Sequence, residues 1–182
     1  MSADDLVAND VTKLVFAGPT GAGKTTAIAA IADAPPVSTE MPLTGGGQAG
    51  KTCTTVALDF ASVRLDGDAT LLLYGMPGQD HYDFMRPILL DGALGIVLVV
   101  AATADDPAAD CATWLRALRA LDASLPFVVG VTQTDRAPAF DIARIRAVLR
   151  AERLSAPIFT VDARDREQVS QLVRVLLLSL GA

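Results

Sequence analysis

Residues 13–26 read KLVFAGPTGAGKTT, and this stretch decides the fold class. It begins with a short apolar run typical of a strand, turns at Gly18, and continues into a helix-forming segment over 26–31. Residues 18–25 match the pattern G-x-x-x-x-G-K-[ST] at every fixed position. A strand, a glycine-rich loop and a helix in this order form the context that a phosphate-binding loop requires. The stretch therefore predicts a nucleotide site, with a glycine turn carrying a chance lysine as the alternative.

The chemistry of a phosphate site explains these residue types. Glycines permit positive φ angles, so successive backbone amides can converge on phosphate oxygens. The helix N-terminus adds unpaired N–H groups and a favourable dipole. Lys24 is expected to reach the β- and γ-phosphates, and the Thr25 hydroxyl is expected to ligate Mg²⁺. We predict these nucleotide-binding residues: Gly18, Thr20, Gly21, Ala22, Gly23, Lys24, Thr25 and Thr26.

Composition limits the class of protein. The chain has 182 residues, is 51% hydrophobic and has a mean hydropathy of +0.39. Its main apolar run lies within the charge-free span 92–104, which is shorter than the roughly 20 residues of a membrane span. The run IVLVV at 96–100 therefore predicts a parallel strand buried on both faces.

Charge and terminal patterns predict a cytoplasmic protein without an intrinsic membrane anchor. The net charge of −6 and pI near 4.6 argue against general binding to nucleic acid or anionic membranes. The first ten residues lack a signal-type pattern, and neither end carries a common lipidation motif. Cys53, Cys111 and His81 supply neither a disulfide framework nor a metal cluster, so both thiols are expected to be reduced.

Alternating strand-like and helix-like segments predict a single α/β domain over residues 1–182. The expected strands are 13–17, 55–65, 70–74, 95–101, 126–131 and 158–161, and the expected helices are 24–32, 82–90, about 111–121, about 142–149 and one from about 166. This order predicts a three-layer sandwich with a six-stranded, mostly parallel sheet. The turn signal Asp66-Gly67 adds one antiparallel edge pair. Ligands of such sheets bind at the carboxyl ends of the strands.

The stretch 33–54 follows the first helix and contains paired prolines and Gly45-Gly46-Gly47. Loops of this length are usually functional or disordered. We expect a mobile switch loop next to the phosphates, with a passive surface linker as the alternative.

Four further strings carry a resemblance over essentially the whole chain. They are TTVALDF at 54–60, LLLYGMPGQDHYDFM at 71–85, DGALGIVLVV at 91–100 and VTQTD at 131–135. Together with the phosphate-binding loop, they resemble Ras/Arf-type small GTPases of bacteria, and are similar to the MglA group and the conservon (CvnD-like) proteins. The resemblance implies a P-loop NTPase fold, a guanine-nucleotide switch with slow Mg²⁺-dependent GTP hydrolysis, GTP or GDP as ligand, and a roadblock-type partner protein.

The resemblance also implies roles around the phosphates. Lys24 and Thr25 match the catalytic lysine and the Mg²⁺ ligand. Thr55 matches the threonine that ligates Mg²⁺ in the triphosphate state, with Thr54 as its close rival. Gly78 matches the glycine that contacts the γ-phosphate, and Gln79 matches the residue that orients the attacking water.

A second group of residues matches the base-binding segments. Thr132, Gln133 and Asp135 follow the fifth expected strand, where such GTPases carry N-K-x-D. A carboxylate at Asp135 accepts two hydrogen bonds from guanine, and adenine cannot offer that pair of donors. An alternative is that Asp135 caps the following segment. After the sixth expected strand come Asp162, Ala163 and Arg164, which match the last base-contacting loop.

The chain departs from the family pattern at two places. Gly75 stands where most relatives have an aspartate that holds a Mg²⁺-bound water, which puts metal affinity in doubt. Gln133 and Thr132 replace a lysine and an asparagine.

A solvent- or partner-facing side chain is expected for His81, and a helix-surface position for Arg86.

Three functions follow as hypotheses. The first is a GTP-hydrolysing switch. The second is a pseudo-GTPase that binds partners and hydrolyses little or nothing, which Gly75 and the altered base motif favour. The third is an ATP-using P-loop enzyme, against which Asp135 argues.

Overall fold

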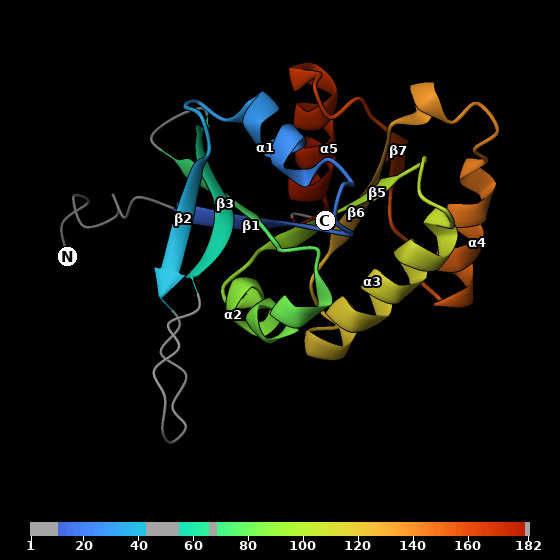
Figure 1. Cartoon of the computed structure of the whole chain (residues 1–182), viewed down its shortest axis with the longest axis horizontal. Helices are drawn as coiled ribbons and strands as arrows, with labels where there is room; N and C mark the ends of the chain where they lie inside the picture. Colours follow the sequence, from blue (N-terminus) through green and yellow to red (C-terminus); the bar gives the residue numbers. More distant parts are fainter. Residues whose placement is uncertain (1–10, 43–54, 66–68, 181–182) are drawn as a thin grey trace, which may run out of the picture.

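A central seven-stranded sheet organises the molecule (Figure 1). The computed structural model describes residues 11–42, 55–65 and 69–180. Across the sheet the strand order is β2-β3-β4-β1-β5-β6-β7, antiparallel at β2-β3-β4 and parallel from β4 to β7. The strands are β1 Val11–Ala17, β2 Val37–Pro42, β3 Thr55–Arg64, β4 Thr70–Gly75, β5 Gly95–Ala101, β6 Phe127–Thr132 and β7 Ile158–Thr160. The predicted α/β fold, with a mostly parallel sheet and an antiparallel pair formed by β3 and β4, is confirmed.

Helices cover both faces of this sheet and make three layers (Figure 1). One face carries α1 Lys24–Ile31 and α5 Arg166–Ser179, and the other carries α2 Arg86–Leu90, α3 Pro107–Leu121 and α4 Ile142–Ala151. Two short 3₁₀ helices, η2 Asp80–Met85 and η3 Thr134–Arg136, follow β4 and β6. Each helical layer buries its apolar side chains against the sheet, so the core lies in two parts separated by the strands.

Aspartates fix where three of the helices begin. The side chains of Asp106, Asp141 and Asp165 each accept hydrogen bonds from backbone amides in the first turns of α3, α4 and α5. These bonds satisfy amides that have no partner inside the helix. The strand β5, at the centre of the sheet, is buried at all seven positions. This confirms the prediction of a strand covered on both faces.

The edge strand β2 differs from the prediction. Residues 33–54 were expected to form a mobile loop, but Val37–Pro42 pair antiparallel with β3, from Val37 opposite Phe60 to Pro42 opposite Thr55. The composition of this proline-flanked segment does not predict a strand. Its extended form comes from backbone pairing with the neighbouring strand. The sheet therefore gains a seventh strand, and residues 43–54 lie outside the described residues.

None of the described helices is long and apolar enough to cross a membrane.

The packing of α5 on the sheet yields a stability prediction. Leu172 is 2% exposed and lies over Gly130, where an added Cβ would come within 2.8 Å of the Leu172 Cδ2 atom. Leu172→Ala is expected to lower the free energy of unfolding by about 2–5 kcal/mol, because it leaves a cavity between helix and sheet. On the same helix, Leu178 is 75% exposed. As the matched control, Leu178→Ala should change stability by less than about 0.5 kcal/mol. Urea unfolding measures both, and equal effects would contradict this packing.

Candidate functional site

The phosphate-binding loop lies between β1 and α1, at the carboxyl edge of the parallel strands (Figure 1). Its first glycine is required by space as well as by conformation. Gly18 has φ 138°, and a Cβ there would lie 2.0 Å from the backbone oxygen of Val99. Gly23, at the N-cap of α1, has φ 97°, a left-handed conformation that favours glycine. The loop can therefore pass close to β5 and turn directly into the helix.

Side chains hold the carbonyl groups of this loop. The Lys24 Nζ atom donates to the oxygens of Gly18 and Pro19, each at 2.7 Å. From the end of β6, the Thr132 hydroxyl donates to the Ala22 oxygen at 2.7 Å, and the Gln133 amide donates to the Gly21 oxygen at 2.9 Å. The C=O and N–H of a trans peptide point in opposite directions. Fixing these carbonyls therefore fixes the direction of the amides that follow them.

Thr132 and Gln133 thus support the phosphate-binding loop, and their predicted contact with the base stays a prediction. Thr132 is 1% exposed, and its hydroxyl donates to two backbone oxygens, those of Ala22 and Val100. Gln133 has φ 58° and accepts a hydrogen bond from the Thr103 hydroxyl at 2.6 Å. The side chains of Thr132 and Gln133 therefore both hold carbonyl groups of the phosphate-binding loop.

Burial sets the electrostatics of Lys24. The residue is 9% exposed, and burial lowers the pKa of its ammonium to about 8, while the charge of Asp59 opposes part of that shift. The amines of most lysines titrate near 10.4. The Lys24 side chain consequently changes from charged to neutral as the pH rises through about 8.

Asp59 on β3 is a site residue that the sequence analysis missed. Its carboxylate accepts a short hydrogen bond from the hydroxyl of Thr25, the predicted metal ligand. In the β3–β4 register Asp59 lies opposite Gly75, and a Cβ at Gly75 would lie 2.9 Å from the Asp59 Cβ and 3.1 Å from its Oδ2. The neighbouring strand thus places a carboxylate beside Gly75, in the space that a side chain at position 75 would occupy. Two features of the sequence could have indicated this residue. Asp59 is the one acidic residue in a largely apolar strand, and the hairpin formed with the next strand places it opposite Gly75.

The rival threonines of the predicted switch loop lie before Asp59. Thr55 begins β3, and neither its side chain nor Thr54 is among the described residues. The metal role of either threonine stays a prediction.

The segment after β4 lies against the phosphate-binding loop. A Cβ at Gly78 would lie 2.3 Å from the Thr20 amide nitrogen and 2.6 Å from the Pro19 carbonyl carbon. Only glycine permits so close an approach. Gln79 follows with an exposed side chain, and its backbone oxygen accepts a hydrogen bond from the Tyr82 amide at 3.1 Å. The structure therefore brings Gly78 to the loop and places Gln79 beside it, while the catalytic role of Gln79 stays a prediction.

Arg86 is not the surface residue that was expected. Its side chain is 12% exposed, pairs with Asp83 at 2.6 Å and lies over the Trp114 ring at 4.5 Å. The guanidinium therefore joins α2 to α3 through a cation–π contact. The side chain of His81 lies outside the described residues.

A cavity of about 190 Å³ adjoins the phosphate-binding loop. Eight of its nine lining residues were predicted nucleotide-binding residues, and Arg136 is the addition. The lining comprises Gly23, Thr26, Thr132, Gln133, Asp135, Arg136, Asp162, Ala163 and Arg164. The structure therefore brings the loop and the two predicted base-binding segments to one place. A larger cavity of about 500 Å³ shares none of these residues, so the smaller one is the candidate nucleotide site.

Three of the four charged side chains that line this cavity, those of Asp135, Asp162 and Arg164, lie together at its rim. Arg164 donates to both carboxylate oxygens of Asp162, at 2.8 and 2.7 Å, and lies 3.8 Å from Asp135. These hydrogen bonds from Arg164 lower the pKa of Asp162 to about 2. The Asp135 side chain is 64% exposed. The rim therefore offers a carboxylate acceptor and a guanidinium donor next to each other.

Comparison with known families adds a finding that the geometry alone does not contain. The family model described as conserved hypothetical ATP binding protein matches residues 44–179, which is well over half of the chain. A search of curated proteins finds no match. Together with the fold, this makes the chain a nucleotide-binding protein of P-loop type.

The family match overturns the resemblance to Ras/Arf-type small GTPases. The predicted GTP switch and its pseudo-GTPase alternative are therefore wrong, as is guanine as the base. Asp135 would exclude adenine only if its carboxylate were buried and left without a partner, because a buried unpaired carboxylate costs free energy. Because Asp135 is largely exposed and lies near Arg164, that cost does not arise. The roadblock-type partner depended on the same resemblance and stays an untested prediction.

The pKa of Lys24 yields a prediction for nucleotide affinity. Triphosphate binding favours the charged amine, so affinity should be constant below about pH 8 and fall above it, by up to about tenfold per pH unit for one proton. Titrations with a nucleoside triphosphate between about pH 7 and about pH 9.5 measure this. Lys24→Arg, which stays charged, should remove the dependence. Lys13→Arg is the matched control, since the pKa of Lys13 is also lowered by burial but Lys13 lies outside the loop. An unchanged affinity up to about pH 9.5 in the wild type would contradict the prediction.

Proposed function

Because the chain belongs to the family of conserved hypothetical ATP-binding proteins, we propose that it binds ATP with Mg²⁺ and hydrolyses it to ADP and phosphate. The single observation that carries this proposal is the phosphate-binding loop with its carbonyls held by Lys24, Thr132 and Gln133. That arrangement leaves amides directed at an anion, which is the requirement for binding a triphosphate.

The phosphates would be held by the backbone and by Lys24. The first amide that bonds within α1 is that of Ala27, which donates to the Gly23 oxygen at 2.9 Å. The amides of Lys24, Thr25 and Thr26 precede it and are available to an anion at the helix N-terminus. On binding, the Lys24 ammonium would exchange the oxygens of Gly18 and Pro19 for phosphate oxygens. This exchange needs no large movement, because the ammonium already lies against the loop.

Thr25 and Asp59 are the residues that would hold Mg²⁺. Magnesium prefers oxygen ligands and is usually bound by one or two carboxylates together with substrate phosphates. A hydroxyl and a carboxylate already in contact at the start of α1 fit that preference. A bound Mg²⁺ would neutralise charge on the phosphates. Asp59 would hold the ion or one of its waters in place of the missing carboxylate at position 75.

The rim of the cavity suits the edge of an adenine ring. Adenine presents an amine donor at N6 beside ring nitrogens that accept. Asp135 supplies an acceptor, and Arg164 supplies donors within 3.8 Å of it. Guanine presents an acceptor, O6, beside two donors, so the carboxylate and the guanidinium can also pair with that base. The preference for adenine is therefore proposed from the family match, and the Asp135–Arg164 pair is compatible with it.

Hydrolysis would proceed by in-line attack of water on the γ-phosphorus. The new P–O bond forms as the bond to the bridging oxygen breaks, and ADP leaves. Lys24 would stabilise the developing charge, and Gln79, beside the loop, would orient the water.

Titration of nucleotide-stripped protein with ATP and with GTP, each with Mg²⁺, tests the proposal. ATP is expected to bind about tenfold or more tightly than GTP, and Asp135→Ala should weaken ATP binding by about tenfold, because the lost hydrogen bond from the N6 amine is worth about 1–2 kcal/mol. Asp105→Ala, an exposed aspartate outside the cavity, is the control and should keep the wild-type affinity for ATP. Tighter binding of GTP than of ATP, or no binding of either, would refute the proposal. Phosphate release measured with the same protein tests the hydrolysis step.

The role of Asp59 can be tested by moving its carboxylate to the neighbouring strand. Asp59→Asn should lower the gain in ATP affinity that Mg²⁺ provides by about tenfold or more, and leave metal-free binding largely unchanged. The double variant Asp59→Gly, Gly75→Asp should restore part of that gain, because the two positions are paired and share one space. Ser62→Ala, at an exposed position on the same strand, is the control. A wild-type Mg²⁺ effect in Asp59→Asn would show that this carboxylate does not serve the metal.

A further inference from the structure

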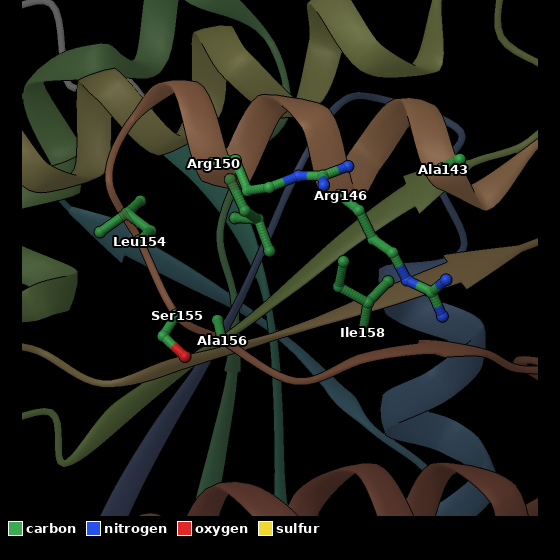
Figure 2. A pocket seen from close by; sticks show the side chains of 8 residues that line it. Ala143, Arg146, Arg150, Leu154, Ser155, Ala156 and Ile158 are labelled. Carbon is green, nitrogen blue, oxygen red and sulfur yellow. The ribbon is translucent and has the colours of Figure 1, made fainter.

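The cavity of about 500 Å³ lies between α4 and the segment that leads into β7 (Figure 2). Arg146 and Arg150 border it from α4, and Arg146 extends toward Ile158 (Figure 2). Leu154 and Ser155 line the side that approaches β7. These residues precede β7, whereas the nucleotide-site residues follow β1, β6 and β7. The cavity is therefore separate from the nucleotide site, at the opposite end of the strands.

The two arginines of this cavity have no acidic partner among the described residues. On the same helix, the Arg144 side chain pairs with Asp106 at 3.0 Å, but neither the Arg146 nor the Arg150 side chain makes an ion pair or hydrogen bond with any residue that the structure describes. They are spaced i, i+4, so both project from one side of α4. The lining of the cavity contains no carboxylate. In a chain with net charge −6, this is a local concentration of uncompensated positive charge.

The rest of the lining is largely apolar. Leu149 is 4% exposed, and Leu154 and Ile158 are half-buried at the same cavity. A ligand that occupies this space would bring anionic groups to the arginines and aliphatic groups to the leucine and isoleucine side chains. Guanidinium groups pair most favourably with carboxylates or phosphates, often through two parallel hydrogen bonds.

The free edge of the sheet indicates the shape of the ligand. β7 pairs only with β6 and forms the edge of the described sheet, and its first residue, Ile158, lines the cavity. Edge strands present unpaired backbone groups to which an extended segment can add. We propose that this cavity and the edge of β7 bind an extended segment of a partner protein. Because successive side chains of a strand point to opposite faces, the segment carries its carboxylate and aliphatic side chains at every second residue, on the face toward the cavity. Arg146 and Arg150 pair with the carboxylates, and the aliphatic side chains enter between Leu154 and Ile158.

Fluorescence anisotropy of a short labelled peptide that repeats Glu-Ser-Leu-Ser, added to the full chain, tests this proposal, because Glu and Leu then lie on one face of the extended peptide. The peptide is expected to bind, and the double variant Arg146→Glu, Arg150→Glu is expected to weaken binding by about tenfold or more, because both charge pairs become repulsive. The double variant to Lys should keep part of the affinity. The matched control is Arg174→Glu, an exposed arginine on α5 in the opposite helical layer, which should bind as the wild type does. Ser155→Trp should also weaken binding, because it fills the cavity without changing charge.

Several outcomes would overturn the proposal. One is equal binding by the wild type and the double Glu variant, and another is an equal loss in Arg174→Glu, which would reflect net charge alone. A peptide with Lys in place of Glu that binds as tightly would refute the charge pairing. Complete displacement of the peptide by inorganic phosphate at low concentration would identify a site for a small anion instead. Circular dichroism of each variant confirms that the fold is retained, and nucleotide binding should be unaffected throughout.

Discussion

The hydrogen bonds that hold the backbone carbonyls of residues 18–22 are the interactions on which the rest of the site depends. A glycine-rich loop alone has too much conformational freedom to hold its amides in one direction, and ordering each residue costs roughly 1–2 kcal/mol. Here Lys24 provides two of the restraints, and the end of β6 and the residue that follows it provide two more, through Thr132 and Gln133. The strand that ends beside the loop thereby fixes the geometry of the phosphate site.

Contact between neighbouring strands also explains why Asp59 and Gly75 occur as a pair. In an antiparallel pair, opposed residues share one space on one face of the sheet, so a carboxylate can be supplied from either strand. Gly75 leaves that space open, and Asp59 fills it and reaches the Thr25 hydroxyl. What looked like the loss of a metal-site residue in one strand is compatible with a metal site built from the next.

Local sequence signals predicted much of this structure, because they depend on contacts within one segment. The phosphate-binding loop, the buried strand β5 and the capped helices α3, α4 and α5 are of this kind. Features that depend on contacts between distant segments were missed. The edge strand β2 forms through pairing with β3, and the approach of Asp59 to Thr25 requires the sheet register. The choice of base was wrong because exposure of Asp135 and the nearby Arg164 are properties of the folded chain.

The most direct measurement is a crystal structure of the chain with Mg²⁺ and a non-hydrolysable ATP analogue. The account predicts phosphates at the amides of the loop, Lys24 Nζ moved from the oxygens of Gly18 and Pro19 to phosphate oxygens, and Mg²⁺ bound by Thr25 and by Asp59 directly or through water. It also predicts adenine beside Asp135 and Arg164. A complex in which the phosphates lie elsewhere, or in which Asp59 has no contact with the ion or its waters, would contradict the account.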